Sequence, residues 1–193
     1  MKKIPITVTK KPFQELRIRD TELRVYSSGR IDRFHKRWDC WRIVKVKPDK
    51  KGYLRIEIDG KTIRCNRIVY YAFNRSTFDL FDSKVEIDHK NRDKTDNCIT
   101  NLRIATHGQN VRNRKTRSDN RCGEKNISPV YIAKGDYWCW KITVQDNGKK
   151  HTRKFRAGSG PIPEILPPIP QEVKETRNDM LDKHHGEFAN YGN

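Results

Sequence analysis

The sequence lacks the features that mark secreted, membrane-spanning or zinc-stabilised proteins. Its N-terminus, MKKIPITVTKKPF, is basic but has no apolar stretch after the charges, and no apolar run approaches the length that spans a bilayer. The five cysteines are scattered and include no C-x-x-C pair, which argues against a zinc knuckle or a redox motif. These absences predict a protein of the reducing cytoplasm with unpaired thiols and no membrane contact.

Hydrophobic and acidic residues are also scarce. Hydrophobic residues make up 34% of the 193 positions, so any core must be small or divided. Acidic residues number 24 against 42 basic ones, which gives a formal net charge of +18. Such an excess indicates a polyanionic partner, because self-repulsion opposes folding until phosphates neutralise it. Nucleases, DNA-binding proteins and basic RNA-binding proteins all remain candidates on this ground.

The first part of the chain reads as β structure. Residues 1–20 look like a basic arm or a first strand, since Pro5 and Pro12 disfavour a helix there. Short alternating segments separated by S-G and D-G turns then predict an antiparallel meander. The predicted strands are residues 23–26, 41–46, 53–58 and 61–65, and residues 67–73 are predicted to form a short helix.

Residues 85–115 hold the densest chemistry. An apolar strand, residues 85–87, ends in Asp88 and His89, a polar turn follows, and residues 99–104 return as the second strand of a hairpin. Thr106 is a suitable N-cap for a helix over residues 107–115. This β-β-α unit can direct one carboxylate, one imidazole and two carboxamides into a single pocket.

Those side chains suit phosphodiester hydrolysis, which needs an activated water, a sink for charge at phosphorus and stabilisation of the leaving oxygen. Asp88 and the side-chain oxygen of Asn110 can hold one hard divalent cation, Mg²⁺ or Mn²⁺. His89 is the candidate general base, because a neutral imidazole is available near pH 7. Asn101 is the candidate partner that fixes its tautomer, whereas Asn97 is assigned to the turn.

The segment resembles the HNH endonuclease motif, in the variant typical of phage and intron homing endonucleases. That variant runs D-H, then N-L, then an Asn in the helix. Here His89 precedes Asn101 by 12 residues and Asn110 by 21. The resemblance implies the roles just given, together with duplex DNA as substrate, 5′-phosphate and 3′-hydroxyl products, and a phage-encoded enzyme acting in a host cell. Asn66-Arg67 stands where the family usually shows His-Arg, so any role of that His is absent.

The last third of the chain predicts a second, smaller module. Strand-like runs at residues 130–133, 137–144 and 151–155 suggest a three-stranded sheet. Five prolines in residues 158–170 make that stretch a stiff connector, and residues 171–188 can close as one helix. Alternation places Trp138, Trp140, Ile142 and Val144 on one face, which we expect to be core, and Cys139, Lys141, Thr143 and Gln145 on the other.

This module resembles the AP2/ERF-like DNA-binding domain found in many phage HNH proteins, in which a three-stranded sheet enters the major groove. The proline-rich connector departs from the short step of that family. The resemblance implies DNA contacts by Lys141, Thr143, Lys154 and Arg156. A second basic group, on and beside the predicted motif helix, is expected to bind the DNA backbone, and it consists of Arg103, Arg112, Arg114, Lys115 and Arg117.

Together these expectations describe an α+β protein with four segments. A β-rich lead-in covers residues 1–83, the ββα-metal HNH motif residues 84–116, a linker residues 117–127, and a sheet-plus-helix DNA-binding module residues 128–193. The predicted function is metal-dependent nicking or double-strand cleavage of duplex DNA. The rival hypothesis is a basic DNA- or RNA-binding protein without catalysis, which predicts no cleavage and no dependence on metal.

Overall fold

The structure is a computed structural model that describes residues 12–192. The chain divides into two compact units, Met1–Thr106 and His107–Asn193, and each is described by itself. This division falls inside the predicted HNH motif, between its hairpin and its helix. Within the described residues, no helix is long and apolar enough to cross a membrane. Most of the predicted basic arm, residues 1–11, lies outside the described part of the chain.

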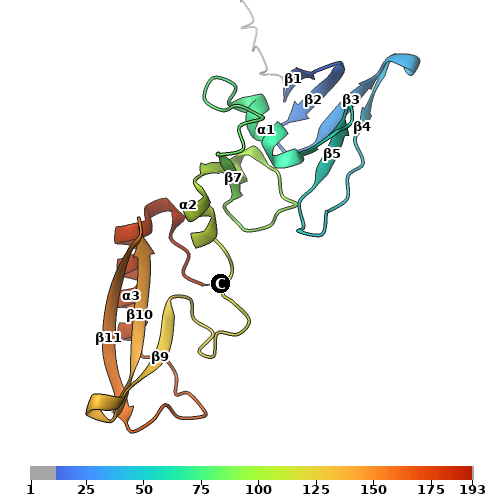
Figure 1. Cartoon of the computed structure of the whole chain (residues 1–193). Coiled ribbons are helices and arrows are strands. Elements are labelled where there is room, and N and C mark those ends of the chain that lie inside the picture. Colours follow the sequence, from blue (N-terminus) through green and yellow to red (C-terminus); the bar gives the residue numbers. More distant parts are fainter. Residues whose placement is uncertain (1–11, 193) are drawn as a thin grey trace, which may run out of the picture. The chain divides into compact units, whose positions relative to one another are not determined.

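The first unit begins with a four-stranded antiparallel sheet in the order β1-β2-β3-β4 (Figure 1). Its strands are β1 (Phe13–Ile18), β2 (Thr21–Tyr26), β3 (Ile31–His35) and β4 (Cys40–Ile43), with a 3₁₀ turn, η1 (Lys36–Trp38), between the last two. The predicted strand over residues 41–46 is therefore shorter, because β4 pairs with β3 only as far as Ile43.

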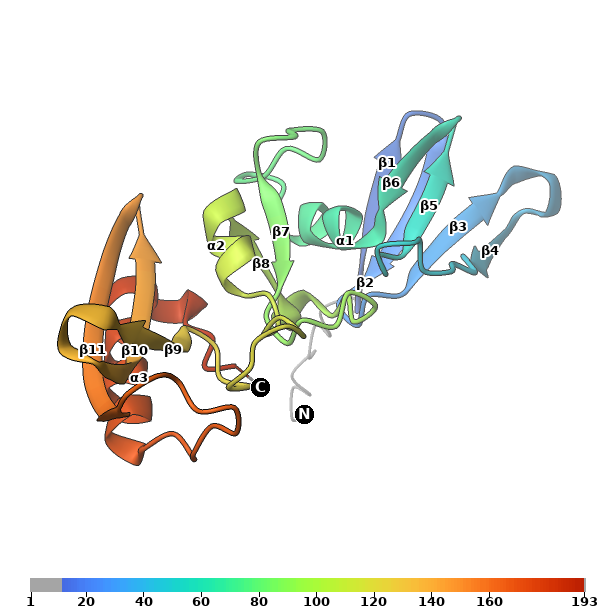
Figure 2. The ribbon, with the colours of Figure 1, turned by 60° about the horizontal axis from the view of Figure 1, so that its bottom comes forward.

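A separate hairpin and one helix complete the body of this unit. Strands β5 (Arg55–Ile58) and β6 (Lys61–Arg64) pair through Asp59 and Gly60, which both have positive φ, as the predicted D-G turn requires. The predicted short helix is confirmed as α1 (Cys65–Phe73). Helix α1 contacts β1, β2, β6 and the hairpin that follows it (Figure 2). Its buried side chains join the sheet residues in one hydrophobic cluster.

The motif hairpin consists of β7 (Glu86–His89) and β8 (Leu102–Ala105), which pair antiparallel. A second strand is confirmed, but it starts later than the predicted residue 99. A 3₁₀ turn, η2 (Ile99–Asn101), precedes it, closed by a hydrogen bond from the Asn101 N–H to the Cys98 carbonyl. Ile87 and Leu102 are buried in the core of the unit, and they fix the hairpin against α1.

The second unit starts with the short helix α2 (His107–Arg112), which ends before the predicted residue 115. The predicted three-stranded sheet is confirmed, in the order β11-β10-β9. Its elements are β9 (Ile127–Ile132), a 3₁₀ turn η3 (Ala133–Gly135), β10 (Tyr137–Asp146) and β11 (Lys149–Ser159). Asn147 and Gly148, both with positive φ, form the tight turn between the two long strands.

The helix α3 (Gln171–His185) packs on one face of this sheet and is followed by η4 (Gly186–Phe188). The predicted helix over residues 171–188 thus ends earlier, at Gly186, whose φ is 51°. Trp138, Trp140, Ile142 and Val144 are buried with Val173 and Leu181 of α3, as their alternation predicts. Cys139 is buried as well, although it lies on the other face of β10.

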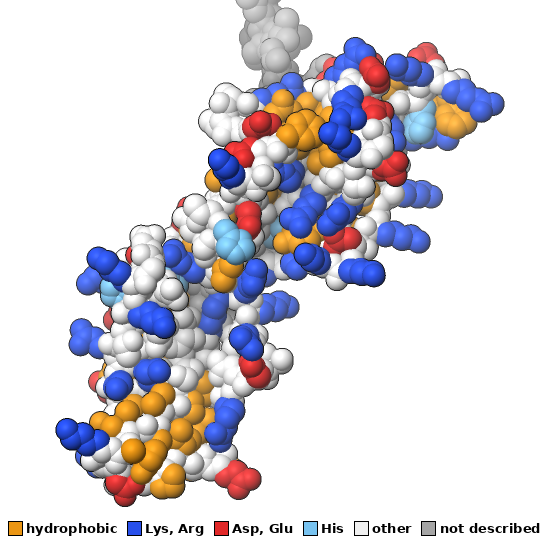
Figure 3. All heavy atoms as spheres, viewed as in Figure 1, with side chains coloured by type: hydrophobic (Ala, Val, Ile, Leu, Met, Phe, Trp, Pro, Cys, Tyr) orange, Lys and Arg blue, Asp and Glu red, His pale blue; other side chains and the backbone are white. Residues whose placement is uncertain are grey.

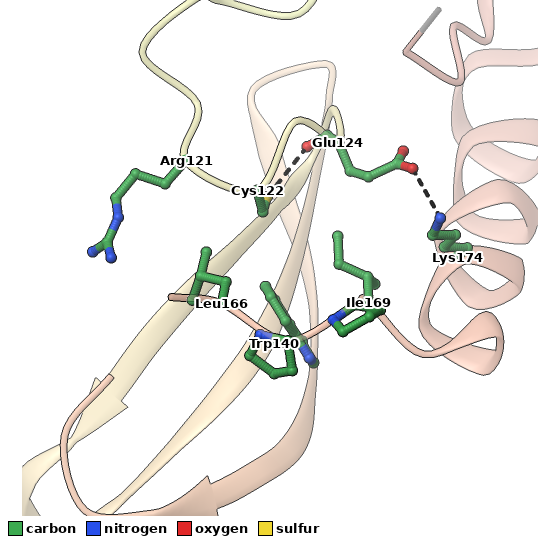
Figure 4. A pocket seen from close by; sticks show the side chains of 9 residues that line it. Arg121, Cys122, Glu124, Trp140, Leu166, Ile169 and Lys174 are labelled. Carbon is green, nitrogen blue, oxygen red and sulfur yellow. Dashed lines mark hydrogen bonds and ion pairs between the residues drawn. The ribbon is translucent and has the colours of Figure 1, made fainter. Parts of the chain in front are cut away.

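The proline-rich connector between β11 and α3 has no regular structure but takes part in the core. Ile162, Leu166 and Ile169 pack against the buried cluster of the second unit. Figure 4 shows Leu166 and Ile169 beside Trp140, with Lys174 paired to Glu124 at the edge of the pocket. The connector therefore covers the indole of Trp140, which is 1% exposed.

Candidate active site

Strand β7 carries Asp88 and His89, and both side chains are buried, each with 4% exposure. Successive side chains of a strand point to opposite faces, so the carboxylate and the imidazole lie on opposite sides of β7. Burying two titratable side chains costs free energy unless each has polar partners. The contacts of Asp88 and His89 are therefore the central feature of the site.

Asp88 forms an ion pair with Arg103, its direct cross-strand partner on β8. The Nε and one Nη of Arg103 each lie 2.9 Å from Oδ2 of Asp88, and the Arg103 side chain is only 13% exposed. Sequence reasoning assigned Arg103 to the DNA backbone. The structure gives its guanidinium a partner inside the protein, and its DNA contact stays a prediction.

His89 is held by an asparagine, but not by the predicted one. Its Nε2 lies 3.0 Å from Oδ1 of Asn97, a buried residue that we had assigned to the turn. The amide of Asn97 is oriented by a hydrogen bond from its Nδ2 to the Thr95 carbonyl. Because an amide oxygen only accepts, Nε2 of His89 carries the proton and Nδ1 is the basic nitrogen.

Burial lowers the pKa of His89, and the hydrogen bond that His89 donates to Asn97 opposes this shift only in part. A lowered pKa keeps the imidazole neutral near pH 7. A neutral imidazole of fixed tautomer is the form that can accept a proton, so the surroundings of His89 suit a general base.

Asn101, the predicted partner of His89, instead holds the loop of residues 91–96. Its Oδ1 accepts from the Asn91 N–H at 3.0 Å, and its Nδ2 donates to the Asn91 side chain at 3.0 Å and to the Asp96 carbonyl at 2.8 Å. In this structure Asn97 rather than Asn101 is hydrogen-bonded to Nε2 of the imidazole, and an orienting role of Asn101 stays a prediction. The 3₁₀ turn at η2 directs its amide into the loop.

Two further contacts position the site, and one depends on a glycine. Gly29, with φ of 90°, lies so close to Asn97 that a Cβ there would be 2.7 Å from the Asn97 carbonyl carbon. Only glycine allows this approach, which fixes the backbone that carries the partner of His89. Next to it, the Ile99 N–H donates to the Ser27 carbonyl at 2.8 Å.

Asn66 and Arg67 of α1 position the strand itself. The Nδ2 of Asn66, which is 3% exposed, donates to the Ile87 carbonyl at 3.1 Å. The guanidinium of Arg67 donates to the backbone carbonyls of Leu80, Asp82 and Val85 in the segment that leads into β7. The sequence marked this pair only as a departure from the usual His-Arg, and its positioning contacts were missed.

The predicted motif helix, α2, belongs to the second unit and carries Asn110 and Arg112. Arg112 pairs with Asp146 of β10, with 2.9 Å between nitrogen and oxygen. Arg117 pairs with Asp119 but is itself exposed, as are Arg114 and Lys115. These three side chains of the predicted backbone-binding group are accessible to solvent.

The four residues predicted to read DNA from the C-terminal sheet do share one face. Lys141 lies opposite Lys154, Thr143 opposite Thr152, and Arg156 opposite Cys139 in the β10–β11 register. Lys154 and Arg156 are exposed, and Lys141 and Thr143 are half-buried. The guanidinium of Arg156 stacks 4.8 Å from the centroid of the Tyr137 ring. Helix α3 packs on the opposite face, so this face is the one that a ligand could reach.

Comparison with known families supports the site. A family model described as HNH endonuclease matches residues 81–112, which include Asp88, His89, Asn101 and Asn110. Residues 81–112 are therefore similar to HNH endonucleases, and the match covers this segment alone.

Comparisons with curated proteins and with solved structures give less information on the site. No curated protein matches the sequence. A solved structure described as "DNA binding and cleavage by the HNH homing endonuclease I-HmuI" is similar at 22% identity and a TM-score of 0.36, covering 68% of this chain and 71% of that chain. A likeness of this size does not equate individual residues of the two proteins.

The donor set of the HNH segment fits a divalent cation. Within residues 12–192, no three carboxylate, imidazole or thiol side chains gather to form a metal site by themselves. The predicted site needs only one carboxylate and one amide oxygen, with water as the remaining ligands, as hard divalent cations accept. Asp88 supplies a buried carboxylate, which Arg103 contacts at Oδ2. The chemistry of these donors therefore suits Mg²⁺ or Mn²⁺.

Proposed function

We propose that the protein is a metal-dependent DNA endonuclease of the homing type, which cleaves phosphodiester bonds in duplex DNA with His89 as general base. The observation that carries the proposal is the buried His89, held through Nε2 by Asn97 and adjacent to Asp88 within a matched HNH segment. The excess of basic residues supports a polyanionic substrate. Lys and Arg side chains are spread over the visible face of both units (Figure 3).

In this mechanism, His89 accepts a proton from the attacking water at Nδ1, while Asn97 keeps the proton on Nε2. Asp88 and Asn110 are the proposed ligands of one divalent cation. When bound, this cation supplies charge stabilisation at phosphorus and at the leaving 3′ oxygen. Arg103 orients the carboxylate of Asp88 and balances its charge. Attack of the water oxygen on phosphorus breaks the bond to the 3′ oxygen, which takes up a proton from solvent, so the products carry 5′-phosphate and 3′-hydroxyl ends.

We assign target binding to the face of the C-terminal sheet that carries Lys141, Thr143, Lys154 and Arg156. An AP2/ERF-like mode, with the sheet in the major groove, is the proposed geometry. The sheet order, the helix on the opposite face and the exposed cations support it. Arg112, Arg114, Lys115 and Arg117 are proposed to bind the DNA backbone beside the motif.

The test is cleavage of supercoiled plasmid by the full chain with Mg²⁺ or Mn²⁺, with and without EDTA. We expect nicked or linear product only with the metal. His89→Ala should lower the rate by roughly two to four orders of magnitude, the usual contribution of a general base, while DNA affinity in EDTA stays unchanged. Cleavage by His89→Ala at the wild-type rate would overturn the mechanism. Metal-independent binding with no cleavage by the wild type would favour a non-catalytic DNA-binding protein.

A further inference from the structure

A tyrosine that the sequence analysis did not single out packs beside the general base. The ring of Tyr53 lies 6.0 Å from the His89 ring, centroid to centroid, at an angle of 46°. Tyr53 lies just before β5, and its backbone N–H donates to Asp49 Oδ1 at 3.0 Å. Asp49 also forms an ion pair with Arg55. The ring is thus fixed next to His89 by the β4–β5 loop.

Two cations from different segments converge on this ring. The Arg64 guanidinium lies 4.2 Å from the centroid of Tyr53, and the Lys94 ammonium lies 4.8 Å from it. Arg64 is the last residue of β6, immediately before α1, whereas Lys94 belongs to the loop after β7. The Lys94 ammonium also donates to the Lys51 carbonyl at 2.7 Å, which ties the two loops together. The three segments therefore build one basic site around Tyr53.

The two cations of this site differ from neighbouring arginines in their ion-pair partners. Arg55 pairs with Asp49, and Arg103 pairs with Asp88. In the described part of the chain, neither Arg64 nor Lys94 forms an ion pair with a carboxylate. A cation is attracted to the face of an aromatic ring, whereas two like charges on one ring repel each other. A bound anion beside this site would relieve the repulsion.

We propose that Arg64 and Lys94, held on Tyr53, bind the phosphate backbone of the DNA strand within a few nucleotides of the bond that His89 cleaves. The inference rests on the proposed endonuclease function, because it takes DNA as the anion. The location follows from the ring contact with His89, since successive phosphates advance by about 3.4 Å along the axis for each nucleotide of a strand. Both cations are already held against the ring, so binding would need little reordering of the side chains.

The test is DNA binding by the full chain in EDTA, where no cleavage occurs, over a range of salt concentrations. Arg64→Gln combined with Lys94→Gln should weaken binding about tenfold and flatten the slope of log K against log salt by roughly one to two units. Lys61→Gln combined with Lys84→Gln removes the same charge from exposed positions of the same unit. This control should leave the contacts near the cut site unchanged.

Ethylation interference then locates the contact. Ethylation of phosphates within a few nucleotides of the cut should weaken binding of the wild type and the control, but no longer that of the Arg64–Lys94 variant. An unchanged salt slope and an unchanged interference pattern would overturn the inference. If the wild type binds DNA but cuts none, the proposed function fails, whereas the salt slope still tests the phosphate contact. If the double variant melts early, Lys94→Gln alone, at an exposed position, should flatten the slope by about one unit.

Discussion

The two candidate functional regions handle polar groups in opposite ways. Asp88 and His89 in the first unit are each 4% exposed and depend on Arg103 and Asn97 as partners. On the C-terminal sheet, Lys154 is exposed and lies opposite Lys141, another cation. Burial and fixed partners suit a group that must hold one protonation state and one orientation. Exposed side chains of like charge suit binding to the phosphates of DNA.

This difference predicts two kinds of mutational effect. Changes around Asp88 and His89 should lower the cleavage rate and leave DNA affinity intact. Changes on the sheet face should weaken binding and leave the rate at saturating DNA intact. A variant that lowers the cleavage rate and the DNA affinity equally would contradict this difference between the two regions.

The largest effect is expected for Asp88→Asn, which keeps the shape of the side chain but removes its charge. The proposed cation loses its only carboxylate ligand, so single-turnover cleavage should fall by about three orders of magnitude. Affinity for DNA in EDTA should stay the same or rise, because a negative charge beside the phosphates is gone. Near-normal cleavage at the wild-type metal concentration would remove Asp88 from the metal site.

The second-largest effect on the cleavage rate is expected at Asn97 and distinguishes its role from that of Asn101. Asn97→Ala removes the hydrogen-bond acceptor of His89 and should lower the rate about 10- to 100-fold, as loss of an orienting partner does. Asn97→Asp keeps an acceptor and adds a charge that stabilises the imidazolium, so it should raise the pKa of His89. The rising limb of the pH–rate profile should then move to higher pH, because His89 must be deprotonated to act.

Asn101→Ala provides the contrast for that experiment. It removes three hydrogen bonds within the loop and should lower the free energy of unfolding by about 1–3 kcal/mol. It should not move the pH–rate profile, because Asn101 does not contact the imidazole. A shifted profile for Asn101→Ala, with none for Asn97→Asp, would restore the assignment made from sequence.

The parts that sequence predicted correctly are those determined locally. The turns at Asp59-Gly60 and Asn147-Gly148 follow from residues that tolerate positive φ. The burial of Trp138 and Trp140 follows from alternation along one strand. Asp88 and His89 were found because they follow an apolar strand directly.

Local sequence does not determine which of the two asparagines is hydrogen-bonded to His89. Asn97 and Asn101 lie four residues apart in the same polar segment, and the sequence alone allows either of them to fold back onto His89. The packing of Gly29 against Asn97 decides between them, and this contact joins residues 68 positions apart. The Asp88–Arg103 pair, in contrast, could have been derived from the hairpin, because the two residues are direct cross-strand partners.

Gly29→Ala tests that packing and should have a smaller effect. A Cβ at this position would displace the Asn97 backbone, so we expect a several-fold loss of cleavage with unchanged DNA affinity. Gly60→Ala is the matched control, since its φ is also positive but nothing lies within 4 Å of the added Cβ. Both changes share a backbone cost of about 1 kcal/mol, seen as a lowered melting temperature. Equal cleavage rates of the Gly29→Ala and Gly60→Ala variants would show that Gly29 does not position the site.

The smallest effect on chemistry is expected on the sheet face. Lys141→Gln combined with Lys154→Gln removes two facing cations from β10 and β11. Affinity should fall about tenfold, and the salt slope should flatten by roughly two units, because each lysine is proposed to contact phosphate or base edges. The single-turnover rate at saturating DNA should stay at the wild-type value.

Lys174→Gln combined with Lys183→Gln is the control for the sheet face. Both residues lie on α3, which packs on the opposite face of the sheet, so the same charge is removed away from the proposed contact. This variant should keep a salt slope close to that of the wild type. If the α3 variant flattens the slope as much as the sheet variant does, affinity follows net charge alone. The sheet face would then not be a specific DNA-binding surface. The two regions would differ only in how deeply their polar side chains are buried.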